Sequence, residues 1–204
     1  MSEDGSALSR TERKRAERIV RIERAAAEVF ADRGFESANF DDIAERLDLR
    51  GSSLFHYFPS KRDLFRRILH HSAAQVFERL QVVVDAGGPP AEIWERLVRE
   101  QVVLQVRDFP EFAPLFFTTT TTDAELRNEV LDLRRQHAAI FERVAESWRQ
   151  DVDADATSTR VRVQIAFGAM AYLGEWYRPD GPVKVEELAR ILAVQLSLAP
   201  ASAG

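Results

Sequence analysis

Apolar residues recur with the spacing of an α-helix along almost the whole of this 204-residue chain. In the first clear run, Ile22, Ala26, Val29 and Phe30 are spaced so that their side chains share one helix face. Strict alternation of apolar and polar residues, which marks a half-buried strand, persists nowhere. The sequence therefore predicts an all-α fold of about nine helices.

Capping and breaking residues divide the first eighty or so residues into three short helices and a longer one. Gly34 stands where a helix C-cap is expected, and Asn39, with Asp42 three residues later, fits the start of a second helix. A third segment begins at Gly51 and is ended by Pro59. This order is the layout of a helix-turn-helix module, whose third segment is a rod that fits the major groove of DNA.

The clearest break in the chain is the segment 85–90, which reads Asp-Ala-Gly-Gly-Pro-Pro. A polar loop is expected at 151–159 and a turn at 178–182. The helices predicted beyond the break span residues 91–108, 110–114, 126–148, 160–177 and 185–199.

Composition excludes several classes of protein. The chain has no cysteine, so disulfides, thiol catalysis and thiolate metal sites are excluded. No apolar run approaches the ~20 residues of a membrane helix, and the polar N-terminus lacks the apolar stretch of a signal peptide. We expect a soluble cytoplasmic protein that does not associate with membranes.

An all-helical enzyme with His137 as general base is an alternative. The sequence shows no carboxylate pair, nucleophile elbow, phosphate loop or metal-ligand spacing. The adjacent His70 and His71 point about 100° apart on a helix, which is a poor geometry for one metal. We therefore expect no enzymatic activity, no cofactor and no metal site.

Basic residues gather near the N-terminus although the whole chain carries a net charge of -5. Residues 10–24 contain seven basic and three acidic side chains, which gives this segment a net charge of +4. A segment with this charge can bind the phosphate backbone of a nucleic acid. The alternative is an ordinary solvated helix face in which the charges pair with one another.

Residues 22–65 resemble the DNA-binding domain of the TetR family of bacterial transcriptional regulators. The match runs from the apolar stripe of the first helix through the segment 30–35 to Tyr57-Phe58 and Ser60-Lys61. The segment 176–181, Trp-Tyr-Arg-Pro-Asp-Gly, also recurs in one broad group of that family. The resemblance implies a basic flexible arm at 1–14, a helix-turn-helix DNA-binding domain at 15–75 and an effector-binding and dimerisation domain at 76–204.

The resemblance assigns DNA contacts residue by residue. Four positions depart from the family pattern. Asp48 and Arg50 replace the usual glycine and serine of the turn, Gly51 stands where lysine is common, and Phe55 replaces a tyrosine that commonly contacts phosphate. Ser52 is an alternative cap for a shortened third helix. The expected DNA-binding residues are Asn39, Arg50, Gly51, Ser52, Ser53, His56, Tyr57 and Lys61, with Lys61 on a phosphate and Arg50 on a base. The alternative is an ordinary polar helix face.

Aromatic residues are dense in the second half, where a cavity between helices is a usual ligand site. The candidate ligand-binding residues are Trp94, Phe112, Phe116, His137, Phe141, Phe167 and Met170. The alternative is a plain apolar core in which His137 is satisfied. Gln101 and Gln105, one helical turn apart, face either a cavity or solvent.

The expected function is that of a repressor that a small apolar or amphipathic effector releases from its operator. Its expected partners are a double-stranded DNA operator, a second copy of the chain in a homodimer, and an effector that is acyl-coenzyme A or another hydrophobic molecule. Small residues at 166–174 and the stripe of the last helix are the expected dimer contacts. The alternative is a helix-turn-helix adaptor that has lost or altered specific DNA binding.

Overall fold

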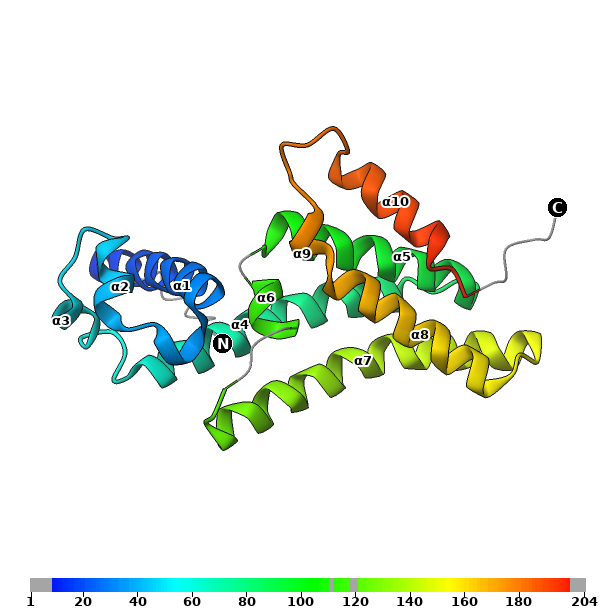
Figure 1. The fold of residues 1–204 in the computed structure, drawn as a ribbon, viewed down its shortest axis with the longest axis horizontal. Helices are drawn as coiled ribbons and strands as arrows, with labels where there is room; N and C mark the ends of the chain where they lie inside the picture. Colours follow the sequence, from blue (N-terminus) through cyan, green and yellow to red (C-terminus); the bar gives the residue numbers. More distant parts are fainter. Residues whose placement is uncertain (1–8, 111, 118–120, 199–204) are drawn as a thin grey trace, which may run out of the picture. The chain divides into compact units, whose positions relative to one another are not determined.

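The computed structural model describes residues 9–110, 112–117 and 121–198, apart from the side chain of Phe112. The described residues are helical and contain no strand, so the all-α prediction is confirmed (Figure 1). The chain divides into one compact unit that ends at Ile68 and another that begins at Leu69. The sequence had placed this boundary after residue 75.

The helices of the first unit are α1 (Arg10–Ser37), α2 (Phe40–Glu45), α3 (Gly51–Leu54) and the first turns of α4 (Lys61–Asp85). Those that follow are α5 (Pro90–Val103), the π-helical turn η1 (Leu104–Asp108), α6 (Phe112–Phe117), α7 (Ala124–Val152), α8 (Ala156–Ala171), α9 (Leu173–Trp176) and α10 (Val185–Gln195).

The predicted caps in the first unit are present. Gly34 interrupts α1 with a φ of 76°, which glycine adopts without steric cost. The Asn39 side chain accepts from the Asp42 amide and the Asp42 side chain accepts from the Asn39 amide, which forms a capping box. At the other end of α1, Ser9 and Glu12 form a second capping box, so residues 10–14 are helical. The flexible arm expected at 1–14 is wrong for these five residues, and residues 1–8 lie outside the described part.

An aromatic cluster fills the core of the first unit. Phe30, Phe35 and Phe65 are buried, with ring centroids 4.9 to 5.8 Å apart. Leu54 of α3 and Ile43 of α2 are also fully buried, and these two helices pack against each other. Burying such a side chain stabilises a fold by about 1.5–3 kcal/mol, so α3 is held mainly by its packing.

The third helix, which the sequence predicts as the rod that fits the major groove, is shorter than predicted. The sequence predicts a helix over 51–58, but α3 ends at Leu54 and residues 55–57 form a turn. The Leu54 carbonyl accepts from the amides of both Tyr57 and Phe58 at 2.9 Å, which closes this turn. Ser52 does not cap the helix, because α3 begins at Gly51 and its N-cap residue, Arg50, makes no side-chain cap.

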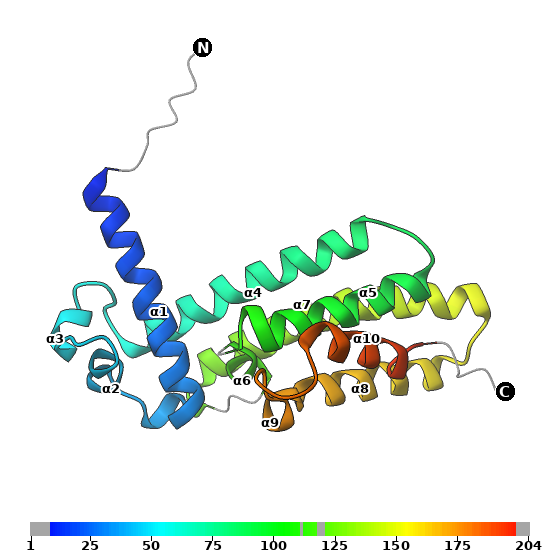
Figure 2. The same ribbon diagram turned by 90° about the horizontal axis from the view of Figure 1, so that it is seen from above.

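In the second unit, α5 packs against both α7 and α10, and α8 packs against α7 (Figure 2). Buried Trp94 of α5 donates its indole N–H to the Leu196 carbonyl at 2.7 Å and so joins α5 to the end of α10. Within the described ranges, no helix has the length and hydropathy needed to cross a membrane.

Two boundaries in the second unit differ from the prediction. The polar loop expected at 151–159 shrinks to three residues, because Asp153 ends α7 in the left-handed conformation and the Asp155 side chain caps α8. The helix expected at 160–177 is interrupted at Tyr172, which separates α8 from α9. The periodicity of apolar residues does not locate helix ends in polar or small-residue stretches such as these.

Gly51→Ala should destabilise the first unit, because an added Cβ would overlap the Asp41 carboxylate and lie 3.0 Å from its Cγ. We expect the free energy of unfolding to fall by about 1–3 kcal/mol in urea denaturation followed by circular dichroism. The double variant Asp41→Ala/Gly51→Ala should recover most of this loss. A double variant no more stable than Gly51→Ala would show that Asp41 is not the obstacle.

Candidate nucleic-acid interface and effector cavity

The segment from Asp48 to Tyr57 presents polar side chains to solvent. Asp48 adopts a positive φ of 52°, which explains why glycine is usual at this position. Arg50, Ser52 and His56 are exposed, whereas Leu54 points into the core. The buried leucine thus fixes which side of this short segment meets a partner.

Arginine from α1 lies beside this surface. The Arg15 guanidinium carbon is 5.3 Å from the centre of the Tyr57 ring, within the range of a cation–π contact. Tyr57 is half-buried and so is Ser53. The basic first turns of α1 therefore border the surface formed by α3 and its turn, which the sequence did not predict.

Gly51 and Asn39, both expected to bind DNA, have other contacts within the first unit. Gly51 is buried against Asp41 and offers no side chain to a partner. Asn39 is exposed, but its side-chain oxygen caps α2 by accepting from the Asp42 amide at 3.0 Å. Phe55, at the position of the usual phosphate-binding tyrosine, is exposed and packs edge-to-face on Phe40.

Lys61 is bound within the first unit. Its ammonium donates to the carbonyl oxygens of Phe35 at 2.6 Å, Glu36 at 3.0 Å and Ala38 at 2.8 Å. It also lies 4.6 Å from the centre of the Phe35 ring. An ammonium has three N–H donors, so in this conformation none remains for a phosphate. The prediction of a phosphate contact missed these carbonyls, which lie about 25 positions earlier in the sequence.

A narrow cavity of about 10 Å³, room for roughly one water-sized group, lies in the second unit. Its wall comes from α4, α5, η1, α6 and α7. The lining residues are Val76, Gln101, Leu104, Gln105, Phe109, Ala113, Phe116, Phe117 and His137. Gln101 and Gln105 are both buried, so they face this cavity and not solvent, the two alternatives that the sequence left open.

His137 is surrounded by aromatic rings. Five phenylalanine rings have centroids 5.3 to 6.1 Å from the imidazole centroid: Phe77, Phe116, Phe117, Phe141 and Phe167. Burial lowers the pKa of His137 to about 4, because this apolar site disfavours the charged imidazole. The ring is therefore neutral near pH 7, and its Nε2 lies 2.8 Å from the Gln101 side-chain oxygen.

The predicted ligand-binding residues separate into two groups. Phe116 and His137 line the cavity. Trp94, Phe141 and Met170 are buried and Phe167 packs on His137 and Phe141, but none of these four is among its lining residues. The side chain of Phe112 lies outside the described part. Aromatic density thus located the region, while the polar pair at 101 and 105 marked the cavity itself.

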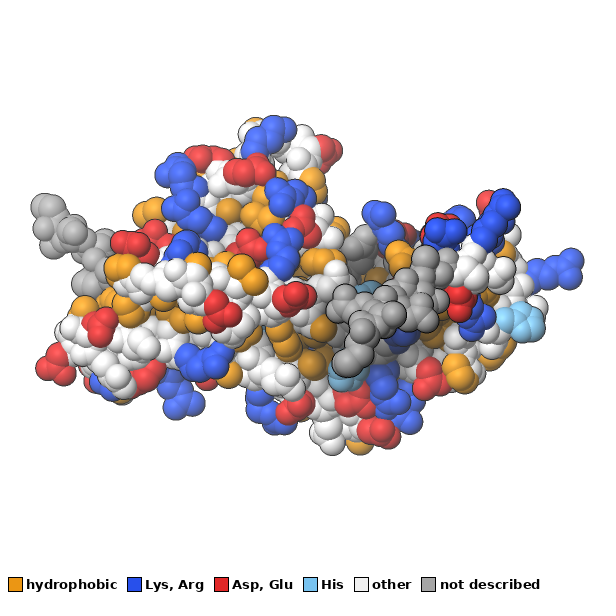
Figure 3. Space-filling model, turned by 180° about the vertical axis from the view of Figure 1, so that it is seen from behind, with side chains coloured by type: hydrophobic (Ala, Val, Ile, Leu, Met, Phe, Trp, Pro, Cys, Tyr) orange, Lys and Arg blue, Asp and Glu red, His pale blue; other side chains and the backbone are white. Residues whose placement is uncertain are grey.

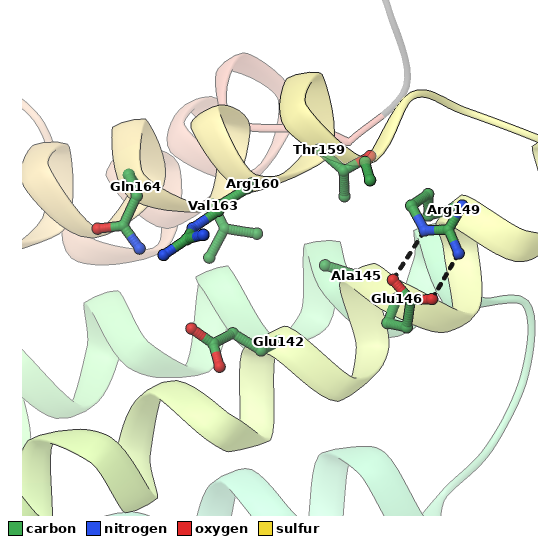
Figure 4. A pocket seen from close by; sticks show the side chains of 9 residues that line it. Glu142, Ala145, Glu146, Arg149, Thr159, Arg160, Val163 and Gln164 are labelled. Carbon is green, nitrogen blue, oxygen red and sulfur yellow. Dashed lines mark hydrogen bonds and ion pairs between the residues drawn. The ribbon is translucent and has the colours of Figure 1, made fainter.

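A second hollow lies between α7 and α8 (Figure 4). It is open to solvent and carries charged side chains, among them Glu142 and Arg160. Arg149 hydrogen-bonds to Glu146 and lowers the pKa of that carboxyl to about 2. Basic and acidic side chains are also mixed over the face seen in Figure 3. The hollow is lined largely by polar and charged side chains and lacks the apolar wall of an effector site.

Two family models match the chain. Residues 22–68 match that of bacterial regulatory proteins of the tetR family, and residues 87–197 match that of the tetracyclin repressor-like C-terminal domain. The second match alone covers more than half of the chain. The chain belongs to the TetR family. It is a DNA-binding transcriptional regulator with an N-terminal helix-turn-helix.

Individual relatives agree with this family. The HTH-type transcriptional repressor KstR2 of Mycolicibacterium smegmatis is 27% identical over 175 residues, which is 80% of each chain. A TetR-family regulator from Bordetella parapertussis superposes with a TM-score of 0.77 at 23% identity, over 87% of this chain and 93% of that one. AibR in complex with isovaleryl coenzyme A and operator DNA has a TM-score of 0.76 at 20% identity, over 89% and 98% of the two chains. The last two likenesses concern the fold.

Lys61→Met should destabilise this TetR-family head, because it keeps the aliphatic stem and removes the donors to three carbonyls. We expect the free energy of unfolding to fall by about 1–3 kcal/mol, measured by urea denaturation. The exposed Lys184→Met should change it by less than about 0.5 kcal/mol. If Lys61→Met weakened DNA binding without lowering stability, Lys61 would be a phosphate ligand and not a positioning residue.

Proposed function

We propose that the protein is a repressor that binds its operator through the surface of α3 and the following turn, and that a small effector in the second unit releases it. The observation that carries this proposal is the exposed set Arg50, Ser52 and His56, fixed by buried Leu54 and bordered by Arg15. Such a set supplies both base-reading and phosphate-binding groups.

The contacts divide by chemistry. Arg50 is proposed to read a guanine through its guanidinium, a pair worth about 1–3 kcal/mol of discrimination. Ser52, Ser53, His56 and Tyr57 are proposed to meet bases or phosphates along the groove. The Asn39 side chain keeps its amide N–H groups for a phosphate while its oxygen caps α2. Lys61 acts by holding the end of α1 in place.

A second copy of the chain is proposed to cover an apolar stripe on α8. Val161, Ile165, Gly168 and Tyr172 are exposed and spaced i, i+4, i+7 and i+11, so they share one face. The exposed fractions of Ile165 and Tyr172 are 58% and 67%. Gly168 lets a partner helix approach closely, whereas Ala166 is buried inside the unit. A twofold dimer would present two recognition surfaces to two half-sites.

The effector is proposed to act through α4, which starts in the first unit. Val76 of α4 lines the cavity, and Arg79 one turn later pairs with Glu100 and Asp108 at 2.5 Å each. Glu100 lies in α5 and Asp108 is the last residue of η1, so α4 is bound to both elements of the cavity wall. A ligand shifts such an equilibrium only through different affinities for the two states.

The complex of AibR with isovaleryl coenzyme A keeps an acyl-coenzyme A among the proposed effectors, beside other hydrophobic molecules. Among the described side chains, no group of three His, Asp or Glu residues is placed to hold a metal ion. We propose a cytoplasmic regulator that acts without catalysis.

DNA binding and dimerisation can be tested together on a duplex that the protein selects from a random library. The log of the affinity should fall linearly with log salt, with a slope of about -0.9 for each phosphate neutralised. Ile165→Glu should give monomers in analytical ultracentrifugation and lose at least about tenfold in affinity, since two linked contacts become one.

The control for this experiment is Val82→Glu, which places a charge at an equally exposed apolar residue of α4. It should leave the dimer and the affinity unchanged. A wild-type protein that selects no duplex at low salt would contradict DNA binding and favour the adaptor alternative. A dimer that survives Ile165→Glu would contradict the α8 interface.

A further inference from the structure

Among the described residues of the second unit, the side-chain oxygen of Gln105 and the Nε of Arg96 are buried without a hydrogen-bond partner, and only Gln105 lines the narrow cavity. We infer that the cavity, which is narrow in this structure, widens by movement of its lining side chains to take the uncharged, mostly apolar end of an effector, and that a hydroxyl or neutral N–H of that end donates to the Gln105 oxygen. The inference rests on the proposed function, because it names the chemistry of the effector at the same site.

The orientation of the Gln105 amide is fixed by its surroundings. Its nitrogen donates to the Met170 carbonyl at 2.6 Å, and a carbonyl oxygen can only accept. The amide oxygen must then point the other way. Gln105 is 5% exposed and lines the cavity, and its oxygen has no hydrogen-bond partner among the described residues. A buried acceptor without a partner costs stability that a donor from a ligand would restore.

The local backbone agrees with a functional site. Gln105 lies in η1, where the helix that begins as α5 widens into a π-helical turn closed by the Phe109 amide on the Leu104 carbonyl at 2.8 Å. Short π-helical turns inside helices are frequent at functional sites. Leu104, Gln105 and Phe109 of this stretch all line the cavity.

The rest of the wall selects against a charged group. Apart from His137, every lining side chain is apolar or an amide. His137 is neutral near pH 7 and its Nε2 is engaged with Gln101. Arg134 approaches from α7, but it donates to the Phe116 carbonyl and does not line the cavity. A carboxylate or an ammonium would enter this wall without a counter-charge, which is costly.

Four probes with six carbon atoms each test, in the full-length protein without DNA, how a hydrogen-bond donor and a charge affect binding. They are 1-hexanol, its isomer 1-methoxypentane, which lacks the donor, hexanoate and hexylammonium. Isothermal titration calorimetry at pH 7 should give 1-hexanol an affinity about five- to tenfold above that of 1-methoxypentane, as one hydrogen bond implies. Hexanoate and hexylammonium should bind at least about tenfold more weakly than 1-hexanol.

Gln105→Leu, which keeps the side-chain size, should bring the ratio of the alcohol and ether affinities to about one. The ratio cancels any general effect of losing the bond to Met170. Gln150→Leu on the exposed face of α7 is the matched control and should keep the wild-type ratio. Should Gln105→Leu fail to fold, the ranking of the four probes by the wild type still decides.

The inference is overturned if a charged probe binds best, if the alcohol has no advantage over the ether, if the advantage survives Gln105→Leu, or if no probe binds. Operator binding, measured separately, distinguishes this failure from that of the proposed function. A protein that binds its duplex but ranks the probes otherwise refutes the chemistry of the cavity alone. A protein that ranks them as expected but binds no duplex refutes the regulator and supports the cavity.

Discussion

The burial of Leu54, on the short helix α3 that packs against α2, is the constraint on which the rest of the first unit depends. A helix of four residues, such as α3, has no stability of its own in water. Its place is set by that leucine, by the close approach of Gly51 to Asp41, and by Lys61, which holds the end of α1. Because these contacts fix the backbone of α3, the positions of its few exposed side chains are fixed as well.

The second unit combines an apolar interior with a few buried polar groups. Gln101 and His137 satisfy each other, and Gln105 is satisfied on one side by Met170. Because the wall is otherwise aromatic and aliphatic, each polar atom in it would have a large effect on which ligand the proposed effector site accepts. Arg79 of α4 pairs with Glu100 of α5 and Asp108 of η1, which connects this wall to α4.

Much of the local structure could be predicted from the sequence, because caps and helical periodicity act over three or four residues. The cap at Asn39, the break at Gly34 and the hydrogen bond of Ser60 just before α4 could all be predicted from such signals. The family resemblance indicated which segment to propose as the recognition surface. It also marked Asp48 as unusual, and the left-handed conformation supplies the physical reason.

The remaining features depend on residues that are distant in sequence. No spacing rule relates Lys61 to the carbonyls of 35–38, Arg15 to Tyr57, or Trp94 to the end of α10. The burial of Gly51 and the free acceptor of Gln105 also follow only from packing. For this reason the sequence indicated the region of the cavity proposed for the effector, while most of the residues that line this cavity could not be predicted.

The most direct test of the central claim, that the 48–57 surface faces DNA, uses two aspartates in the same backbone conformation. Asp48 and Asp153 have φ values of 52° and 50° and both are exposed, but only Asp48 borders the recognition surface. The measurement is the affinity of Asp48→Asn and Asp153→Asn for the selected duplex at low salt. Asp48→Asn should bind about two- to fivefold more tightly, because a negative charge near phosphates is removed, and Asp153→Asn should match the wild type. Equal affinities for all three proteins would contradict the account.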